Sequence, residues 1–359
     1  MEQKWNRPQQ LFLFLLLIVL LLGSLNVAKA KGWLIPSQPV PPVNGKIISL
    51  NSLTLDQKIA QMIIVAGARQ NVPAWKKMQV GGIHLFALQN EQLFHDTIAE
   101  VQEGMTIPFF VTVDLEGCRN PFATFREFTA ASNIRTEGQA FEKGSEEGKF
   151  LAALGISINF APVVDLEDTI WHCRSFPGNE THIAELAEAY VLGLQKEGIM
   201  ATAKHYPGKT LVVRDPHKFL VAAEISSQDL FPYQYLAEKD DVKAIMVSHV
   251  IPSGAVTSSV PSVASVDVVQ QLRKNFNGLI ITDEINMLGL KDFYPTREEM
   301  YLAVIEAGND LILNFNDDPQ EIYRMIQVIK AAVEEGRIPQ ERIDASVRKI
   351  LEAKGFTVI

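Results

Sequence analysis

Cysteine and clustered positive charge are both scarce in this sequence. The 359 residues include two cysteines, and 33 Lys and Arg stand against 42 Asp and Glu, which gives a net charge of −9. Because no basic run interleaved with aromatic residues offers a footprint for phosphates, we expect no nucleic-acid partner. The composition, 47% hydrophobic and 21% charged, is that of a chain that buries a large core, which excludes disorder as its main state.

Motifs that bind common cofactors and metals are also missing. No Gly-x-Gly-x-x-Gly segment follows the early apolar runs, and the sequence contains no His-Glu-x-x-His pair. It therefore indicates neither a dinucleotide nor zinc, and we predict no cofactor and no metal site.

The first thirty residues differ in composition from the rest. Lys4 and Arg7 precede an unbroken apolar run, Leu11–Leu22, and residues 28–30 read Ala-Lys-Ala. A basic start, a short apolar stretch and a small-x-small triplet are typical of a signal peptide. The run falls short of the roughly 20 residues that span a bilayer. We predict that residues 1–30 are a signal peptide and that the protein is exported; the alternative is an uncleaved membrane anchor, the one case in which we expect membrane contact.

Prolines separate this segment from the remainder. Four of them lie within residues 35–42, where they oppose helix and favour extended backbone. We therefore predict an extended tether over residues 31–52 and a single domain over residues 53–359.

From about residue 54 onward, short β-branched runs alternate with helix-period stretches such as residues 183–197, 266–275 and 320–335. Eight strand-and-helix units favour a (β/α)8 TIM-type barrel, and the continuous apolar character of the strands is typical of a parallel sheet covered on both faces. A doubly wound open sheet is the alternative. The eight predicted strands are residues 62–67, 82–87, 108–114, 157–165, 201–206, 243–250, 278–284 and 310–315.

Charged and polar side chains gather where these strands end. In a barrel the carboxyl ends of the strands form one rim, which carries the active site. Because buried charge is costly unless it is paired or used, this gathering predicts a functional site. The residues are Asp114 at the end of the third strand, Arg174 after the fourth, Lys204 and His205 on the fifth, Asp215 and His217 in the next loop, Ser248 and His249 at the end of the sixth, and Asp283 and Glu284 at the end of the seventh.

Several segments resemble glycoside hydrolase family 3, and in particular its single-domain bacterial β-N-acetylhexosaminidase branch. The most specific are KHYPG followed six residues later by DPH, and TDEINM, which is similar to the family's S-D-D-L-S-M nucleophile signature. The segments are LTLDQKIAQMIIV from Leu53, VDLEG from Val113, NFAPVVD from Asn159, KHYPG from Lys204, DPH from Asp215 and TDEINM from Thr282.

The resemblance implies a chemistry for three residues. Asp283 would attack the anomeric carbon and form a covalent glycosyl-enzyme, as retaining hydrolysis requires. His217 would be the acid and base, oriented by Asp215 two residues earlier; histidine suits this task because its ordinary pKa of about 6.5 is close to working pH. Asp114, Arg174, Lys204 and His205 would contact sugar hydroxyls.

The function implied is that of an exported, retaining exo-β-N-acetylhexosaminidase that releases terminal N-acetylglucosamine from peptidoglycan fragments or chitin-like oligosaccharides. We expect an oligosaccharide substrate and a monomeric protein. Two alternatives stay open: a carbohydrate-binding barrel with impaired catalysis, and a β-N-acetylglucosaminide phosphorylase.

The sequence also departs from the family pattern. The loop usually written P-G-H-G reads Pro-Gly-Lys209-Thr210 here, and Pro216 stands between the members of the Asp-His pair. Phe122 replaces an arginine that contacts substrate in the family, and Arg126, one helical turn further on, is a possible substitute.

The two cysteines follow neighbouring predicted strands. Cys118 lies just after the third strand and Cys173 just after the fourth, so a parallel barrel brings their loops side by side. Disulfides persist in exported proteins. We hypothesise a Cys118–Cys173 disulfide at the mouth of the site; the alternative is two unpaired thiols.

Overall fold

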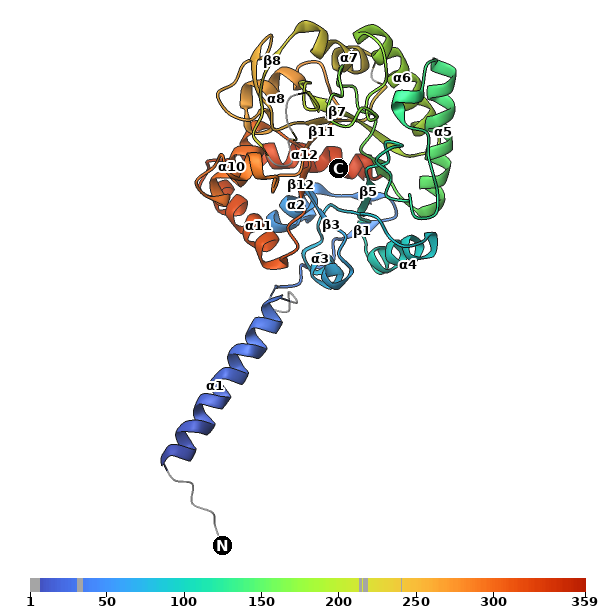
Figure 1. Cartoon of the computed structure of the whole chain (residues 1–359). Helices are drawn as coiled ribbons and strands as arrows, with labels where there is room; N and C mark the ends of the chain where they lie inside the picture. The colour runs from blue at the N-terminus through green and yellow to red at the C-terminus, as the bar shows by residue number, and fades with distance from the viewer. Residues whose placement is uncertain (1–6, 31–34, 213–214, 216–218, 240) are drawn as a thin grey trace.

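Eight parallel strands form the centre of the molecule, with helices around them (Figure 1). The computed structural model describes residues 7–30, 35–212, 215, 219–239 and 241–359. The strand order is β11-β9-β7-β6-β5-β4-β3-β12. The strands are β3 (Ile63–Ala66), β4 (Gly82–His84), β5 (Phe110–Val113), β6 (Ile158–Asn159), β7 (Met200–Tyr206), β9 (Ala244–Val247), β11 (Leu279–Thr282) and β12 (Ile312–Asn314).

The two ends of this sheet meet. A parallel bridge joins Ile281 of β11 to Leu311, and the backbone N–H of Thr282 donates to the Leu311 carbonyl at 2.9 Å. The N–H of Ile285 donates to the Leu313 carbonyl at 3.0 Å. The sheet therefore closes into a (β/α)8 barrel, as predicted, and the open doubly wound sheet is wrong. Each of the eight predicted strands overlaps one barrel strand.

The helices that surround the barrel begin at polar caps. The side chains of Thr54, Thr136 and Ser226 each accept a hydrogen bond from the backbone N–H three residues on, which satisfies a donor that the helix leaves free. The predicted helical stretches are confirmed as α6, α8 and α11. The helices of the barrel are α2 (Leu55–Gln61), α3 (Val72–Met78), α4 (Glu91–Gln102), α5 (Glu137–Leu154), α6 (Glu180–Lys196), α7 (Ser227–Glu238), α8 (Val266–Arg273), α9 (Leu288–Lys291), α10 (Arg297–Ala307), α11 (Pro319–Glu334) and α12 (Gln340–Ala353), and the 3-10 turns are Leu50–Ser52, Arg69–Asn71, Ala131–Asn133 and Ser262–Ala264.

The segment predicted to be a tether is in large part folded onto the barrel. Strands β1 (Val43–Asn44) and β2 (Ile47–Ile48) form a hairpin, and β2 pairs in parallel with β13 (Thr357–Val358) near the C-terminus. Ile35, Ile48 and Leu50 are buried. The segment predicted to be an extended tether thus packs on the barrel over its described residues 35–52, through apolar side chains whose burial the proline pattern does not reveal.

A second unpredicted pair of strands follows β7 and β9. Strand β8 (Ala222–Ile225) pairs in parallel with β10 (Ile251–Gly254), and the N–H of Ile251 donates to the Val221 carbonyl at 2.8 Å. This pair holds the far end of the loop that begins after β7 and contains Asp215.

The N-terminal segment forms helix α1 (Arg7–Ala30), which extends away from the barrel (Figure 1). Within the described residues, no helix meets the length and hydropathy needed to cross a membrane. The assignment of residues 1–30 as a signal peptide stays a prediction.

We expect a chain that begins at residue 53 to unfold at a lower temperature than one that begins at residue 35. Loss of three buried aliphatic side chains, Ile35, Ile48 and Leu50, removes about 5 kcal/mol of burial energy, or about 10 °C in melting temperature. Thermal unfolding followed by circular dichroism measures the difference. Equal melting temperatures would contradict the packing of this segment.

Candidate active site

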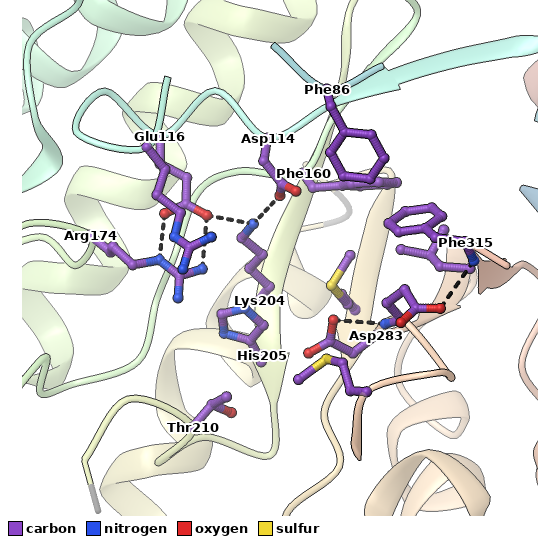
Figure 2. A pocket seen from close by; sticks show the side chains of 15 residues that line it. Phe86, Asp114, Glu116, Phe160, Arg174, Lys204, His205, Thr210, Asp283 and Phe315 are labelled. Carbon is purple, nitrogen blue, oxygen red and sulfur yellow. Dashed lines mark hydrogen bonds and ion pairs between the residues drawn. The ribbon is translucent and has the colours of Figure 1, made fainter. Parts of the chain in front are cut away.

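A cavity of about 260 Å³ lies at the carboxyl ends of the barrel strands (Figure 2). Seven of the strands or the loops that follow them contribute to its wall. Asp283 and the basic side chains predicted from the sequence share this cavity with aromatic and sulfur-containing residues. The lining residues are Phe86, Asp114, Glu116, Arg119, Phe160, Arg174, Lys204, His205, Thr210, Met246, Asp283, Glu284, Met287, Leu313 and Phe315.

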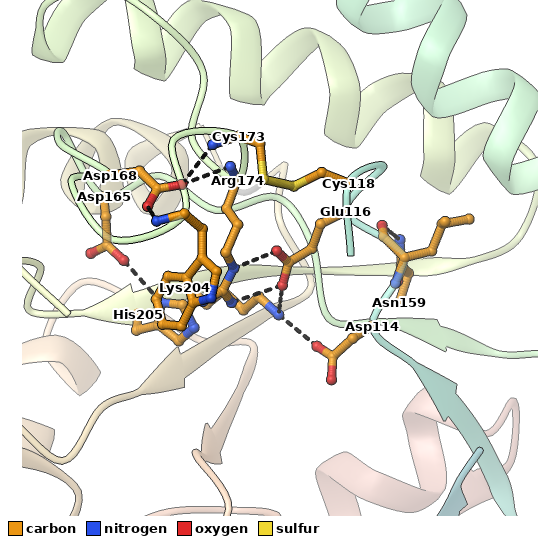
Figure 3. Close-up of polar contacts among 12 residues, drawn as sticks. Asp114, Glu116, Cys118, Asn159, Asp165, Asp168, Cys173, Arg174, Lys204 and His205 are labelled. Atoms are coloured by element: carbon orange, nitrogen blue, oxygen red, sulfur yellow. Dashed lines mark hydrogen bonds and ion pairs between the residues drawn. A yellow bond between two sulfur atoms is a disulfide. The ribbon is translucent and has the colours of Figure 1, made fainter. Parts of the chain in front are cut away.

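Lys204 lies at the centre of a network of paired charges. Its Nζ is 2.6 Å from Asp114 Oδ1 and 2.6 Å from Glu116 Oε1. Arg174 binds the same glutamate through two bonds, from Nε to Oε2 at 2.6 Å and from Nη2 to Oε1 at 2.9 Å (Figures 2 and 3). The side chains of Glu116, Arg174 and Lys204 are almost fully buried, whereas Asp114 is 40% exposed. Asp114 is thus the member of the network that a ligand reaches most easily.

The network keeps its members ionised. Burial alone would raise the pKa of Glu116, but the charges of Arg174 and Lys204 outweigh burial and hold that pKa far below its usual range. Burial likewise opposes ionisation of Asp114, and Lys204 with His84 lowers the pKa of its carboxyl. The pKa of Arg174 is raised, because the nearby Glu116 outweighs the effect of burial. At neutral pH the carboxyl groups of Asp114 and Glu116 and the guanidinium of Arg174 are therefore charged.

A buried amide holds the backbone of this wall. Asn159, at the end of β6, accepts a hydrogen bond from the Leu115 N–H at 2.8 Å and donates to the Leu115 carbonyl at 2.8 Å. Its Nδ2 also lies 3.1 Å from Tyr190 Oη, which donates to Glu147 at 2.6 Å. Because Leu115 stands between Asp114 and Glu116, this clamp sets the direction in which both carboxylates leave the strand.

Lys204 and His205 both line the cavity although they are consecutive on β7. In a regular strand their side chains would point to opposite faces, but the pairing of β7 with β9 shifts register between Lys204 and Tyr206. His205 Nδ1 lies 2.9 Å from Asp165 Oδ2, and Tyr233 Oη lies 3.4 Å from Asp165 Oδ1. Burial raises the pKa of Asp165 to about 7, although Arg174 acts in the opposite direction.

Asp283, the predicted nucleophile, lies across the cavity from the charged network (Figure 2). The N–H of Asp283 donates to the Val247 carbonyl at 2.9 Å, and its Oδ1 accepts a hydrogen bond from the Glu284 N–H at 2.8 Å. Glu284 turns to the end of β12, where its Oε1 accepts from the Phe315 N–H at 3.0 Å and from Asn286. Burial raises the pKa of Glu284. Asp283 is therefore the carboxylate of this pair that is available to a ligand, and Glu284 joins β11 to β12.

Aromatic rings form the remaining wall. His84 stacks between Phe160 and Phe315, with ring centroids 5.6 and 4.8 Å apart, and Phe86 meets the His84 ring edge-on at 4.8 Å. Phe86 remains 54% exposed at the mouth. Such faces pack against the apolar side of a sugar ring while polar groups bind its hydroxyls.

The structure contains the hypothesised disulfide between Cys118 and Cys173, with Cα atoms 6.1 Å apart. Cys173 directly precedes Arg174, and Cys118 is two residues from Glu116 (Figure 3). Asp168 accepts hydrogen bonds from the N–H groups of Cys173 and Arg174 at 3.0 and 2.8 Å. The covalent bond thus ties together the two loops that carry the bidentate ion pair.

The structure brings six of the predicted strand-end residues to one cavity: Asp114, Arg174, Lys204, His205, Asp283 and Glu284. Asp215 belongs to the loop after β7 and its carbonyl accepts from the Phe219 N–H at 3.2 Å, whereas His217 and Pro216 lie outside the described residues. Ser248 and His249 are buried away from the cavity lining, and His249 Nε2 lies 2.9 Å from the Glu284 carbonyl. The catalytic and sugar-binding roles of these residues stay predictions.

Neither Phe122, which stands where the family has an arginine, nor Arg126, its possible substitute, lines the cavity. Phe122 is fully buried against Phe94 and Phe150 and does not line the cavity. Arg126 pairs with Glu146 at 3.2 Å and lies over the Phe150 ring, so the idea that it substitutes in the cavity is wrong. The Arg126 guanidinium contacts the exposed Glu146 carboxylate and the Phe150 ring instead.

Sequence reasoning missed Glu116, Asp165 and the aromatic wall as parts of the site. Asp165 is the last residue of a predicted strand, so the rule of strand ends could have found it, and Glu116 stands in the VDLEG segment two residues after Asp114. The aromatic residues carry no signal of their own, because an apolar residue near a strand end reads as core.

Comparison with known proteins points to one family. The sequence model described as Glycosyl hydrolase family 3 N terminal domain matches residues 54–353. A Mycobacterium tuberculosis protein named beta-hexosaminidase LpqI is 28% identical over 326 residues, which are 83% of this chain and 82% of that protein. A beta-hexosaminidase of Haemophilus influenzae is 31% identical over 291 residues, which are 75% of this chain and 80% of that protein.

Solved structures agree with this similarity. M. tuberculosis LpqI has a TM-score of 0.78 and 26% identity, with 89% of this chain and 99% of that chain covered. A family 3 β-N-acetylglucosaminidase from Paenibacillus has a TM-score of 0.76 and 29% identity, with 84% and 62% covered.

Loss of the disulfide should destabilise the protein and weaken substrate binding. The bridge closes a segment of 55 residues and its removal is expected to cost about 2–5 kcal/mol in the free energy of unfolding. We expect Cys118→Ser/Cys173→Ser to show this loss in urea unfolding and to raise KM, because Arg174 is adjacent to Cys173. Since Cys118 is exposed, dithiothreitol should reproduce both effects in the wild type.

The double-serine variant is also the control for the reductant, because it lacks the chain's only two cysteines. Dithiothreitol should leave its stability and KM unchanged. A wild-type protein that unfolds at the same urea concentration with and without reductant would contradict the bracing role.

His84 should make stability fall below neutral pH. Burial, opposed in part by Asp114, lowers the pKa of His84 from 6.5 to about 4. Between these values the unfolded chain binds a proton that the folded protein does not, so stability is lost as pH falls through this window, by up to about 3 kcal/mol. In urea unfolding at pH 7 and pH 4.5, His84→Gln should lose less stability than the wild type. The control is His95→Gln on the exposed face of α4, which should follow the wild type; if His84→Gln follows it too, the assignment to His84 is wrong.

Proposed function

The chain belongs to glycosyl hydrolase family 3 and is a glycoside hydrolase, and from this premise we propose that it is an exported, retaining exo-β-N-acetylhexosaminidase. Its substrates are oligosaccharides that end in β-linked N-acetylglucosamine, from peptidoglycan fragments or chitin-like chains. The observation that carries the proposal is the position of Asp283 across one small cavity from the Lys204–Asp114–Glu116–Arg174 network.

The geometry suits a carboxylate nucleophile facing a polar sugar-binding wall. The Asp283 carboxylate is oriented at Oδ1 by the N–H of Glu284. Asp114, the exposed member of the network, and Lys204 beside it offer an acceptor and a donor for sugar hydroxyls. Charge-assisted hydrogen bonds of this kind are the stronger ones, so they position the sugar ring firmly against the nucleophile.

The reaction proceeds in two displacements. In the first, an Asp283 oxygen forms a bond to the anomeric carbon as the bond to the leaving oxygen breaks, and His217 gives that oxygen a proton. In the second, His217 takes a proton from water, whose oxygen displaces Asp283 and restores the configuration of the sugar. Asp215 orients His217 for both steps. The assignment of His217 and Asp215 rests on the sequence motif.

Two observations support the substrate class. The relatives with similar sequences carry the names beta-hexosaminidase and β-N-acetylglucosaminidase. The cavity of about 260 Å³ is smaller than the roughly 300–1,000 Å³ of pockets for drug-sized ligands, which suits one terminal sugar unit and hence exo action.

Export is supported by the N-terminal sequence and by the disulfide. Residues 1–30 have the order of charge, apolar run and small residues that signal peptides have, and the Cys118–Cys173 bond is of a kind that persists in oxidising compartments. The N-terminal mass of the protein recovered from outside the cytosol tests this part: a chain that begins at Lys31 agrees with it, and an intact N-terminus indicates the anchor instead.

Release of a chromophore from an aryl β-N-acetylglucosaminide tests the activity. We expect the full-length protein to hydrolyse this substrate much faster than the aryl β-glucoside. Asp283→Ala should lower kcat by at least about a thousandfold, because it removes the nucleophile. Asp292→Ala, which changes an exposed aspartate in the same part of the chain, is the control and should keep wild-type rates.

The products distinguish the remaining outcomes. Release of free N-acetylglucosamine in the presence and absence of phosphate supports hydrolysis. Formation of a sugar phosphate when phosphate is present would instead show that the protein is a phosphorylase. A folded wild-type protein that binds N-acetylglucosamine but cleaves neither substrate would overturn the proposed activity.

A further inference from the structure

The hydroxyl of Thr210 is a polar group that has no role in the proposed reaction. Thr210 lines the cavity with Asp283 and His205 (Figure 2), and its side chain is almost fully buried. Its Oγ1 has no hydrogen-bond partner in the described structure. Buried hydroxyls are nearly always hydrogen-bonded, and one left without a partner lowers the stability of the folded protein. A buried hydroxyl on the wall of a ligand cavity is therefore suited to a ligand.

The backbone around Thr210 is fixed rather than loose. The N–H groups of His205 and Thr210 both donate to the buried carboxylate of Asp165, and the N–H of Gly208 donates to the His205 carbonyl at 2.8 Å. Asp165 also bonds the His205 ring at 2.9 Å. One carboxylate thus sets the positions of the His205 ring and of the Thr210 backbone. The hydroxyl is held in place before any substrate arrives, which reduces the entropy cost of using it.

We propose that Thr210 is a substrate-binding residue whose hydroxyl bonds a hydroxyl group of the sugar held beside Asp283. The proposal rests on the proposed glycosidase function and deepens it. A neutral hydrogen bond of this kind contributes about 0.5–1.5 kcal/mol, which corresponds to roughly two- to tenfold in kcat/KM.

The test compares Thr210→Val with Thr202→Val in the full-length protein. Thr202 lies on β7, is fully buried, and its Oγ1 also lacks a partner in the described structure, but it does not line the cavity. The two variants thus lose the same group from equally buried positions. We expect Thr210→Val to lower kcat/KM for the aryl β-N-acetylglucosaminide by about two- to tenfold, and Thr202→Val to leave it unchanged.

Substrates that lack one hydroxyl identify the partner of Thr210. Aryl N-acetylglucosaminides without the 3-, 4- or 6-hydroxyl are compared with the parent compound in the wild type and in Thr210→Val. The proposal expects that one of the three deoxy compounds loses kcat/KM in the wild type and loses no further activity when Thr210 is also changed, since the same bond is then already absent.

The outcomes separate this inference from the proposed function. If the wild type hydrolyses the parent substrate but Thr210→Val matches Thr202→Val, or reduces all three deoxy compounds as much as the parent, the role of Thr210 is wrong and the glycosidase stands. If the wild type does not hydrolyse the parent, the proposed function fails first. Should Thr210→Val not fold, Thr210→Ser against Thr210→Ala repeats the comparison, because these variants also differ by the hydroxyl alone.

Discussion

Two buried cations at the barrel mouth, Lys204 and Arg174, are compatible with the fold only because Glu116 and Asp114 pair with them. Removing a charge from water costs several kcal/mol unless an opposite charge and hydrogen bonds replace the water. Glu116 meets that need for both cations, through two bonds to Arg174 and one to Lys204 at 2.6 Å. The pairing also leaves Asp114 partly exposed. The same network therefore stabilises the buried charges and offers a carboxylate to a ligand.

The surrounding structure serves to keep this network in register. Asn159 clamps the residue between the two carboxylates, and the Cys118–Cys173 bond joins the loops on either side of the Glu116–Arg174 pair. Asp165 likewise fixes the orientation of the His205 ring on the neighbouring strand β7, through a contact of 2.9 Å. A rigid polar wall of this kind is oriented before the ligand arrives, which is how an active site gains from electrostatics without reorganising when the reaction occurs.

Much of the barrel was predictable because its signals are local. All eight barrel strands overlap the short runs predicted from the sequence, and helices α6, α8 and α11 follow from a period of 3.6. The rule that polar residues at strand ends meet on one rim placed Asp114, Arg174, Lys204, His205 and Asp283 together. Prediction failed where short segments depend on partners that are distant in the sequence. Strand β2 pairs with β13 from the other end of the chain, and β8 pairs with β10.

The sequence by itself determined the fold class, the family and the residue types gathered at the mouth, because apolar periodicity and motif spacing are properties of neighbours along the chain. Only the tertiary structure decided which of those residues pair. Glu116 binds Arg174 across 58 positions and Lys204 binds Asp114 across 90, and Arg126 turned out to lie outside the cavity. The choice of partner depends on distance and burial in three dimensions. For the same reason, only the tertiary structure places Thr210, with its unpartnered hydroxyl, on the wall of the cavity.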